Sequence, residues 1–86
     1  MRWTIDWTDN ARRDLRRLDR QMAQRAIAAV ERLAATGQGD VTRLQGVEPP
    51  EWRLRVGDWR VRFAYDFGSS AIHVLRVLPR VRAYRD

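Results

Sequence analysis

Four arginines that alternate with apolar residues are the side chains of this chain best suited to chemistry. They lie in the segment from Trp52 to Phe63, and they are Arg53, Arg55, Arg60 and Arg62. Strict alternation is typical of strands that bury one face. Gly57-Asp58 between the two runs predicts a two-residue hairpin turn, with the glycine first. The register of such a hairpin sets Arg55 opposite Arg60 and Arg53 opposite Arg62, all on one face.

This clustering of positive charge predicts an anionic ligand. Like charges opposite each other destabilise a pair of strands, and a planar guanidinium binds two phosphate oxygens at once. All 17 basic residues are arginine, and the net charge is +6. An arginine-favouring codon bias explains the absence of lysine more simply than function does, but it does not choose strand faces. We therefore expect a polyanionic or acidic partner.

Several kinds of chemistry lack the residues they need. No glycine-rich phosphate loop follows a predicted strand, which argues against a nucleotide cofactor. The chain has no cysteine and one histidine, which argues against a zinc site. Carboxylates near the arginines are few, namely Asp58 and Asp66, so paired-carboxylate or metal-dependent hydrolysis is not expected. We expect neither a cofactor nor a metal.

An all-cationic face with a phenol nearby suits the cleavage of RNA through its own 2′-hydroxyl. That reaction builds negative charge on a pentacoordinate phosphate, which preorganised guanidinium groups stabilise. Arg76, Arg80 and Tyr84 follow the hairpin and could join it. A tyrosine has an ordinary pKa of about 10, and neighbouring arginines favour the phenolate. An arginine is a poor acid, so we expect it to stabilise charge on the leaving oxygen.

The elements that position these residues can be read from capping signals and periodicity. A strand ends at Trp7, and Thr8 is predicted to cap a helix with the apolar stripe Ala11, Leu15 and Leu18. Asp19 is predicted to cap a second helix with the stripe Met22, Ala26, Val30 and Leu33, which Gly37 ends. The stretch 40–51 reads as a connector.

The remaining strands complete the predicted fold. The second hairpin strand continues to Phe67, and a third strand runs from Ala71 to Leu78 and ends at Pro79. The third strand is apolar on both faces except for His73 and Arg76, which predicts a central strand covered on both sides. The order β-α-α-β-β-β predicts one α+β domain over residues 1–86. A helical hairpin should pack on the apolar face of a small, antiparallel-rich, twisted sheet, opposite the arginines.

The other aromatic side chains and the histidine are expected to have structural roles. Trp52, Trp59 and Tyr65 fall on the apolar face and are expected in the core, although tryptophans can also stack on bases. His73 is expected to be structural. No apolar run reaches the roughly 18 residues of a membrane span, and the N-terminus lacks a signal-peptide pattern. We expect a cytoplasmic protein that does not associate with membranes.

Several short motifs together resemble RelE-type toxins of the RelE/ParE superfamily, the toxin half of type II toxin–antitoxin systems of bacteria and archaea. The motifs span nearly the whole chain: Ala11-Arg12-Arg13-Asp14-Leu15 with Leu18, Leu44-Gln45-Gly46, Trp52-Arg53-Leu54-Arg55, Trp59-Arg60-Val61-Arg62-Phe63, and Val74-Leu75-Arg76-Val77-Leu78-Pro79-Arg80 followed by Tyr84. The resemblance implies a ribosome-dependent mRNA endoribonuclease that inhibits translation. It implies mRNA, the ribosome and a cognate antitoxin as partners.

The resemblance also implies roles for single residues. Arg60 matches the arginine that binds phosphate, Arg80 the one that serves the leaving group, and Tyr84 the tyrosine that stacks on the base or transfers a proton. Arg53 and Arg55 match a basic pair, and Arg62 and Arg76 extend the RNA-binding set. Pro79 replaces a His or Lys of many members, and Arg replaces Lys at positions 53 and 55. The acid and the base therefore stay open.

Two other functions remain as alternatives. The ParE branch of the superfamily implies a non-enzymatic inhibitor of DNA gyrase, and Arg60, Arg80 and Tyr84 together favour the nuclease over it. A simple basic RNA- or DNA-binding module would bind in a salt-sensitive way without cleavage. In either toxin, an antitoxin would lay an amphipathic helix or strand across the apolar and basic surfaces. Self-association is compatible with the sequence, which specifies no dimer.

Overall fold

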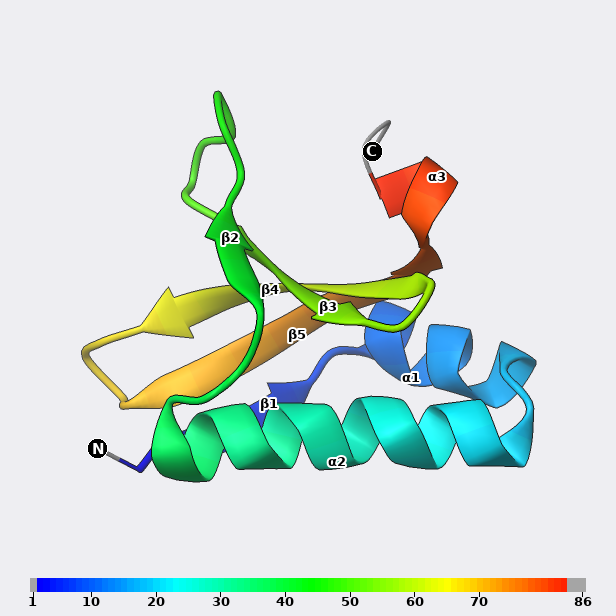
Figure 1. The fold of residues 1–86 in the computed structure, drawn as a ribbon. Coiled ribbons are helices and arrows are strands. Elements are labelled where there is room, and N and C mark those ends of the chain that lie inside the picture. The colour runs from blue at the N-terminus through cyan, green and yellow to red at the C-terminus, as the bar shows by residue number, and fades with distance from the viewer. Residues whose placement is uncertain (1, 84–86) are drawn as a thin grey trace.

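The computed structural model describes residues 2–83 as a five-stranded mixed sheet with two helices on one face (Figure 1). This is the predicted α+β fold, with the sheet order β1-β5-β4-β3-β2. The elements are β1 Thr4–Trp7, α1 Asp9–Arg17, α2 Arg20–Thr36, β2 Val41–Arg43, β3 Trp52–Val56, β4 Trp59–Asp66, β5 Ala71–Pro79 and α3 Arg80–Ala83.

The helix boundaries lie where the capping residues predicted them. The Thr8 hydroxyl oxygen accepts a hydrogen bond from the Ala11 amide (3.3 Å), and the Asp19 carboxylate accepts one from the Met22 amide (2.8 Å). Each hydrogen bond gives an acceptor to a backbone N–H that has none within the first turn of its helix. Gly37 ends α2 in the left-handed conformation, with φ of 77°. Thr8 also donates to the Val74 carbonyl at 2.7 Å and so ties the start of α1 to β5.

The arginine hairpin forms in the predicted register. Arg55 pairs with Arg60, Leu54 with Val61, and Arg53 with Arg62. Gly57, at the first turn position, has φ of 59°, a conformation that side chains with a Cβ adopt at a cost. β3, β4 and β5 make the predicted antiparallel meander, and β1 joins its edge parallel to β5.

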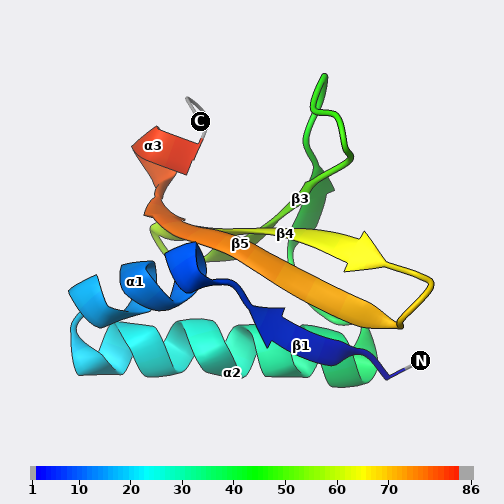
Figure 2. The same cartoon turned by 180° about the vertical axis from the view of Figure 1, so that it is seen from behind.

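Two sequence expectations about the sheet are wrong. The stretch 40–51 is not only a connector, because its residues Val41–Arg43 form β2, which pairs antiparallel with β3. Three residues are too short for alternation to mark a strand. β5 is an interior strand, but α1 and α2 cover only one of its faces (Figures 1 and 2). The pairing register of β4 with β5 shifts between Arg62 and Phe63. As a result Val74 and Val77, three residues apart, both pair with residues that face the helices. This break in the two-residue alternation gave the sequence the pattern of a strand that is buried on both faces.

The core lies between the helices and the apolar face of the sheet. Its largest fully buried side chains are Phe63, Leu54, Ile72, Val30, Val61, Val74 and Val77. Each such side chain contributes about 1.5–3 kcal/mol of transfer free energy. Leu78 is also buried, but it is the register partner of Arg60 on the opposite face. Trp52, Trp59 and Tyr65 are partly buried against this core, which confirms their expected place. The rings of Trp52 and Tyr65 lie 4.8 Å apart, edge to face.

Candidate nucleic-acid interface

The arginines of the sheet form two cross-strand rows on the face opposite α1 and α2. We call Arg53, Arg62 and Arg76 the inner row, because they are register partners across β3, β4 and β5. We call Arg55 and Arg60 the outer row, next to the hairpin turn; the β5 partner of Arg60 is Leu78. The rows are two residues apart along a strand, which is about 7 Å.

Arg60 is buried without a neutralising carboxylate. The residue is only 5% exposed, and its Nη1 donates to the carbonyls of Gly57 and Trp59, both at 2.9 Å. No carboxylate within residues 2–83 makes an ion pair with it. Because every fully buried side-chain nitrogen in this part of the chain has a hydrogen-bond partner, the donors of Arg60 that make no hydrogen bond keep some contact with solvent. The arrangement holds a positive charge ready for an anion.

Arg62, in contrast, is neutralised by Glu51. The Nε and Nη2 of Arg62 donate to Glu51 Oε1 at 3.0 and 2.7 Å. The two side chains are only 10% and 17% exposed. Glu51 directly precedes β3, and its carbonyl accepts from the Leu44 amide at 3.0 Å. This glutamate therefore joins the base of the β2–β3 loop to the middle of the sheet face.

Arg76 is held by Asp14 of α1. Its Nε and Nη2 donate to the two oxygens of Asp14 at 2.8 and 3.3 Å, and the Val77 amide donates to Asp14 Oδ2 at 2.8 Å. β1 ends opposite Val74, so the later residues of β5 have no strand on that side. The buried Asp14 supplies the acceptor that a neighbouring strand would otherwise provide.

The other predicted site residues lie around these rows. Arg55 is exposed and Arg53 is half-buried. Arg80 is exposed and begins α3, and its amide donates to the Asp58 carbonyl of the hairpin turn at 2.9 Å. The chain entering α3 is thus tied to the turn beside the outer row. Tyr84 lies outside the described residues. α3 and the β2–β3 loop both rise from the sheet on the side away from α1 and α2 (Figures 1 and 2).

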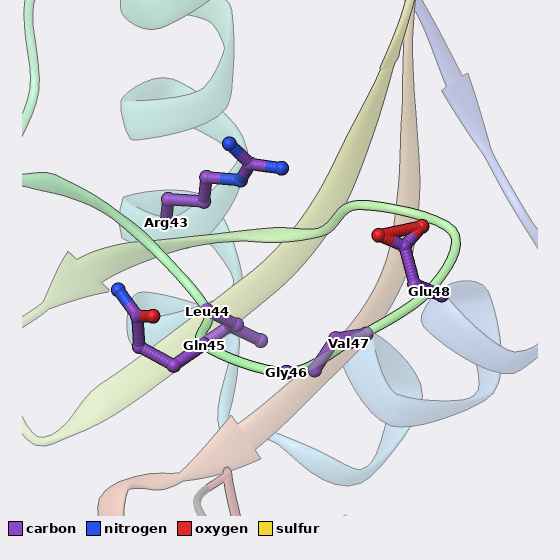
Figure 3. A pocket seen from close by; sticks show the side chains of 6 residues that line it. All are labelled: Arg43, Leu44, Gln45, Gly46, Val47 and Glu48. Atoms are coloured by element: carbon purple, nitrogen blue, oxygen red, sulfur yellow. The ribbon is translucent and has the colours of Figure 1, made fainter.

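The β2–β3 loop encloses a small pocket of about 250 Å³ (Figure 3). It is lined by Arg43, Leu44, Gln45, Gly46, Val47 and Glu48. The side chains of Arg43, Gln45 and Glu48 extend from separate parts of the loop (Figure 3). The Arg43 guanidinium lies over the Trp52 ring, 5.8 Å from its centroid, in a cation–π contact. Because one short segment makes the whole pocket, it does not join the arginine rows.

His73 bridges two carboxylates at the far end of the same face. Its Nδ1 lies 2.8 Å from Asp6 Oδ2, and its Nε2 lies 3.4 Å from Asp66 Oδ2. The hydrogen bond with Asp6, followed by the one with Asp66, raises the pKa of His73 above its ordinary value. The histidine links β1, β5 and β4, in keeping with the structural role expected for it.

Metal-ligand clusters and membrane-spanning helices are both absent from the described residues. No cluster of His, Asp and Glu in this part of the chain is arranged to hold a metal ion. No helix between residues 2 and 83 combines the length and the apolar character needed to cross a membrane.

The fold is that of the RelE/ParE superfamily of toxins. The family model described as the ParE toxin of type II toxin–antitoxin systems, parDE, matches residues 5–84. The chain belongs to this family. Comparison with curated protein sequences finds no match.

Solved toxin structures share the fold over most of their length. The archaeal RelE–RelB complex from Pyrococcus horikoshii OT3 superimposes with a TM-score of 0.77 at 23% identity, covering 95% of this chain and 99% of that one. The RelBE2 toxin–antitoxin complex from Mycobacterium tuberculosis gives 0.62 at 26% identity, covering 93% and 100%. A mutant of the E. coli toxin RelE in the free state gives 0.72 at 15% identity, covering 92% and 84%.

Sequence reasoning missed the two carboxylates that hold arginines of the inner row. Glu51 stands beside a proline pair in a presumed connector, and Asp14 lies on a helix otherwise rich in arginine. Asp14 and Arg76 come from segments far apart in the chain, and they meet only in the folded structure. Glu51 lies two residues before Arg53, on the same face as the strand arginines, so the predicted hairpin register, continued beyond Trp52, would have placed it beside Arg62.

Proposed function

We propose that this toxin is an endoribonuclease that cleaves mRNA on the ribosome and so inhibits translation. The observation that carries the proposal is Arg60, a buried guanidinium with open donors and no carboxylate partner within residues 2–83. Burying a charge without a counter-charge costs stability. Because the charge of Arg60 does not stabilise the fold, its presence at a buried position supports a role in binding a phosphate.

The chemistry suited to this face is attack by the RNA's own 2′-oxygen on the adjacent phosphorus. The 2′-oxygen loses its proton and forms a new bond to phosphorus, and the bond from phosphorus to the 5′-oxygen breaks. The departing 5′-oxygen takes up a proton, so that no net proton is gained or lost. Products would be a cyclic phosphate and a free 5′-hydroxyl. Negative charge grows on the phosphate oxygens during this step, and a preorganised guanidinium stabilises it more strongly than mobile water does.

The role proposed for each arginine depends on where it lies on the sheet face. Arg60 would bind the phosphate that reacts, and Arg55, opposite it and exposed, would hold the substrate with Arg53. Arg80, tied through its backbone to the hairpin turn, would stabilise the leaving 5′-oxygen. Tyr84 would stack on a base or accept a proton. The pairing of Arg62 with Glu51 argues for a supporting rather than a direct role.

A cognate antitoxin is the proposed protein partner. The similar structures from Methanococcus jannaschii and Mycobacterium tuberculosis are described as toxin–antitoxin complexes, and that from Pyrococcus horikoshii as a RelE–RelB complex. An acidic segment on the antitoxin would complement the arginine face and block access to Arg60.

Inhibition of DNA gyrase without catalysis is the second candidate, because the matching family model is that of ParE toxins. This activity needs a basic docking surface but no reaction at a phosphate. The two candidates differ in what Arg60 does, so they can be separated by experiment.

Mapping 5′ ends of cellular mRNA after induction of the toxin tests the proposal. New ends within translated codons, carrying 5′-hydroxyls, are expected for the wild type. The Arg60→Ala and Tyr84→Phe variants should fold and produce neither the ends nor growth arrest. Intact mRNA together with loss of gyrase supercoiling activity would instead establish the second candidate.

A further inference from the structure

Carboxylates neutralise two arginines of the inner row, Arg62 and Arg76, but none of the outer row within residues 2–83. Glu51 pairs with Arg62, and Asp14 pairs with Arg76. In the described part of the chain, Arg55 and Arg60 have no ion-pair partner. The positive potential of the face is therefore concentrated beside the hairpin turn, although the inner row has three arginines and the outer row two.

The spacing of the rows makes this difference important for a polyanion. The rows lie about 7 Å apart along the strands. A nucleic-acid strand carries one negative charge at every nucleotide. An unneutralised Arg62 would therefore offer a second cation one step away from Arg60, and a strand could bind out of position.

We propose that Glu51 sets the register in which an RNA strand binds the sheet face, by removing Arg62 from phosphate binding. The proposal deepens the proposed nuclease function and rests on it for its biological meaning. Glu51 would touch no substrate atom, so it is a positioning residue. It acts through Arg62 and keeps this one guanidinium from binding a phosphate beside the one held by Arg60.

The geometry suits this role. One oxygen of Glu51 accepts both donors of Arg62, at 3.0 and 2.7 Å, which leaves that edge of the guanidinium unable to fork onto a phosphate. The Glu51 carbonyl is bonded to the Leu44 amide, so its carboxylate is fixed at the base of the β2–β3 loop. Stability alone does not require the pair, because apolar side chains of similar size often serve as well as a buried ion pair.

The test measures binding of a single-stranded 2′-deoxy oligonucleotide, which lacks the attacking hydroxyl and cannot be cut. Glu51→Gln should bind it about two- to fivefold more tightly, since one more cation becomes available. The slope of log K against log salt should steepen by about 0.7, the value for one additional phosphate contact on a single strand. Glu48→Gln is the matched control. Glu48 is exposed and makes no ion pair with any residue between 2 and 83. Its replacement removes the same charge from the same loop, so the slope of log K against log salt should equal that of the wild type.

The double variant Glu51→Gln/Arg62→Gln separates positioning from a purely structural role. It removes the pair together, so it should return both affinity and slope to wild-type values. A slope shallower than wild type would mean that Arg62 already binds phosphate, and it would overturn the proposal. The double variant still shows whether Arg62 binds phosphate in the wild type, even if Glu51→Gln alone does not fold. An unchanged slope in a folded Glu51→Gln protein, or an equal gain in Glu48→Gln, would also overturn it.

Ribosome-bound mRNA supplies the functional readout. Glu51→Gln should lower KM and kcat together and scatter the cut positions, because tighter binding includes unproductive registers. Absence of cleavage by the wild type would refute the nuclease proposal. The salt dependence of oligonucleotide binding would still show whether Glu51 keeps Arg62 from binding phosphate.

Discussion

Arg60 and Arg62 lie two residues apart on one strand face, yet their surroundings differ completely. Arg62 has a carboxylate at hydrogen-bond distance, whereas Arg60 has only two backbone carbonyls. The first arrangement stabilises the native state once both charges are buried together. The second leaves charge and donors available for a ligand.

Replacement by methionine should separate these two roles. Arg62→Met leaves Glu51 nearly buried without its partner, so the free energy of unfolding should fall by about 2 kcal/mol. Arg60→Met removes an unneutralised charge and should change it by less than about 1 kcal/mol. Urea denaturation followed by circular dichroism measures both. Equal losses would mean that Arg60 has a structural role as large as that of Arg62.

His73 gives the fold a dependence on pH at the residue scale. Folding raises its pKa because the ring is hydrogen-bonded to Asp6 and, more weakly, to Asp66. A neutral imidazole has one N–H, so only the protonated ring can donate to both carboxylates. The pKa of Asp66 is lowered, chiefly by its hydrogen bond with Ser69 and then by His73.

The His73 contribution should be lost at alkaline pH. With a raised folded pKa, its stabilisation is fully present below the ordinary histidine pKa of about 6.5 and disappears as the pH rises through the raised value. His73→Gln should therefore lower the urea midpoint at pH 5.5 more than at pH 9. Asp6→Asn should show the same pH trend. A mutant–wild-type difference that did not vary between these pH values would contradict the bridge.

At the element scale, α1 completes the edge of β5 where β1 stops. The helix places Asp14 against the Val77 amide and the Arg76 guanidinium. This contact and the Thr8–Val74 hydrogen bond fix the helix to the strand that leads into α3 and Arg80. An error in this docking would move the chain that carries one of the proposed catalytic residues.

Asp14→Ala should destabilise the fold through this edge. It leaves the Val77 amide without an acceptor in a buried position, which costs about 2 kcal/mol. Hydrogen exchange of the Val77 amide should accelerate more than that of amides in β3. Asp9→Ala is the control on the same helix. Asp9 is exposed and lies 4.0 Å from Arg12, so its loss should cost less than about 0.5 kcal/mol.

At the scale of the whole molecule, α1 and α2 cover one face of the sheet (Figures 1 and 2), and the strand register places the arginine rows on the other. The exposed arginines of α1 belong to the helical layer and contribute to the net charge of +6. Net charge speeds the encounter with a polyanion. Local phosphate contacts determine how steeply affinity falls with salt.

Salt dependence should show which face meets the nucleic acid. Arg55→Gln should reduce the slope of log K against log salt by about 0.7 for a single-stranded oligonucleotide, because one phosphate contact is lost. Arg13→Gln, the same charge change on α1, should leave the slope unchanged. The reverse result would place the nucleic acid on the helical layer.

Local signals were sufficient for much of the fold. Thr8, Asp19 and Gly37 each act through backbone groups only a few residues away, so sequence spacing alone located both helices. Alternation and Gly57 fixed the register of the hairpin for the same reason. β2 could not be predicted, because its three residues are a strand only through pairing with β3.

The sequence by itself determined that four arginines share one face of a hairpin, since the two-residue period of a strand leaves no other arrangement. Only the tertiary structure decided which of them are neutralised. Glu51, at the start of β3, pairs with Arg62 on the neighbouring strand, and Asp14 reaches Arg76 from a helix far away in the chain. Charge pairing depends on distances of a few ångströms between side chains, and those distances exist only once the helices, the loop and the sheet have packed together.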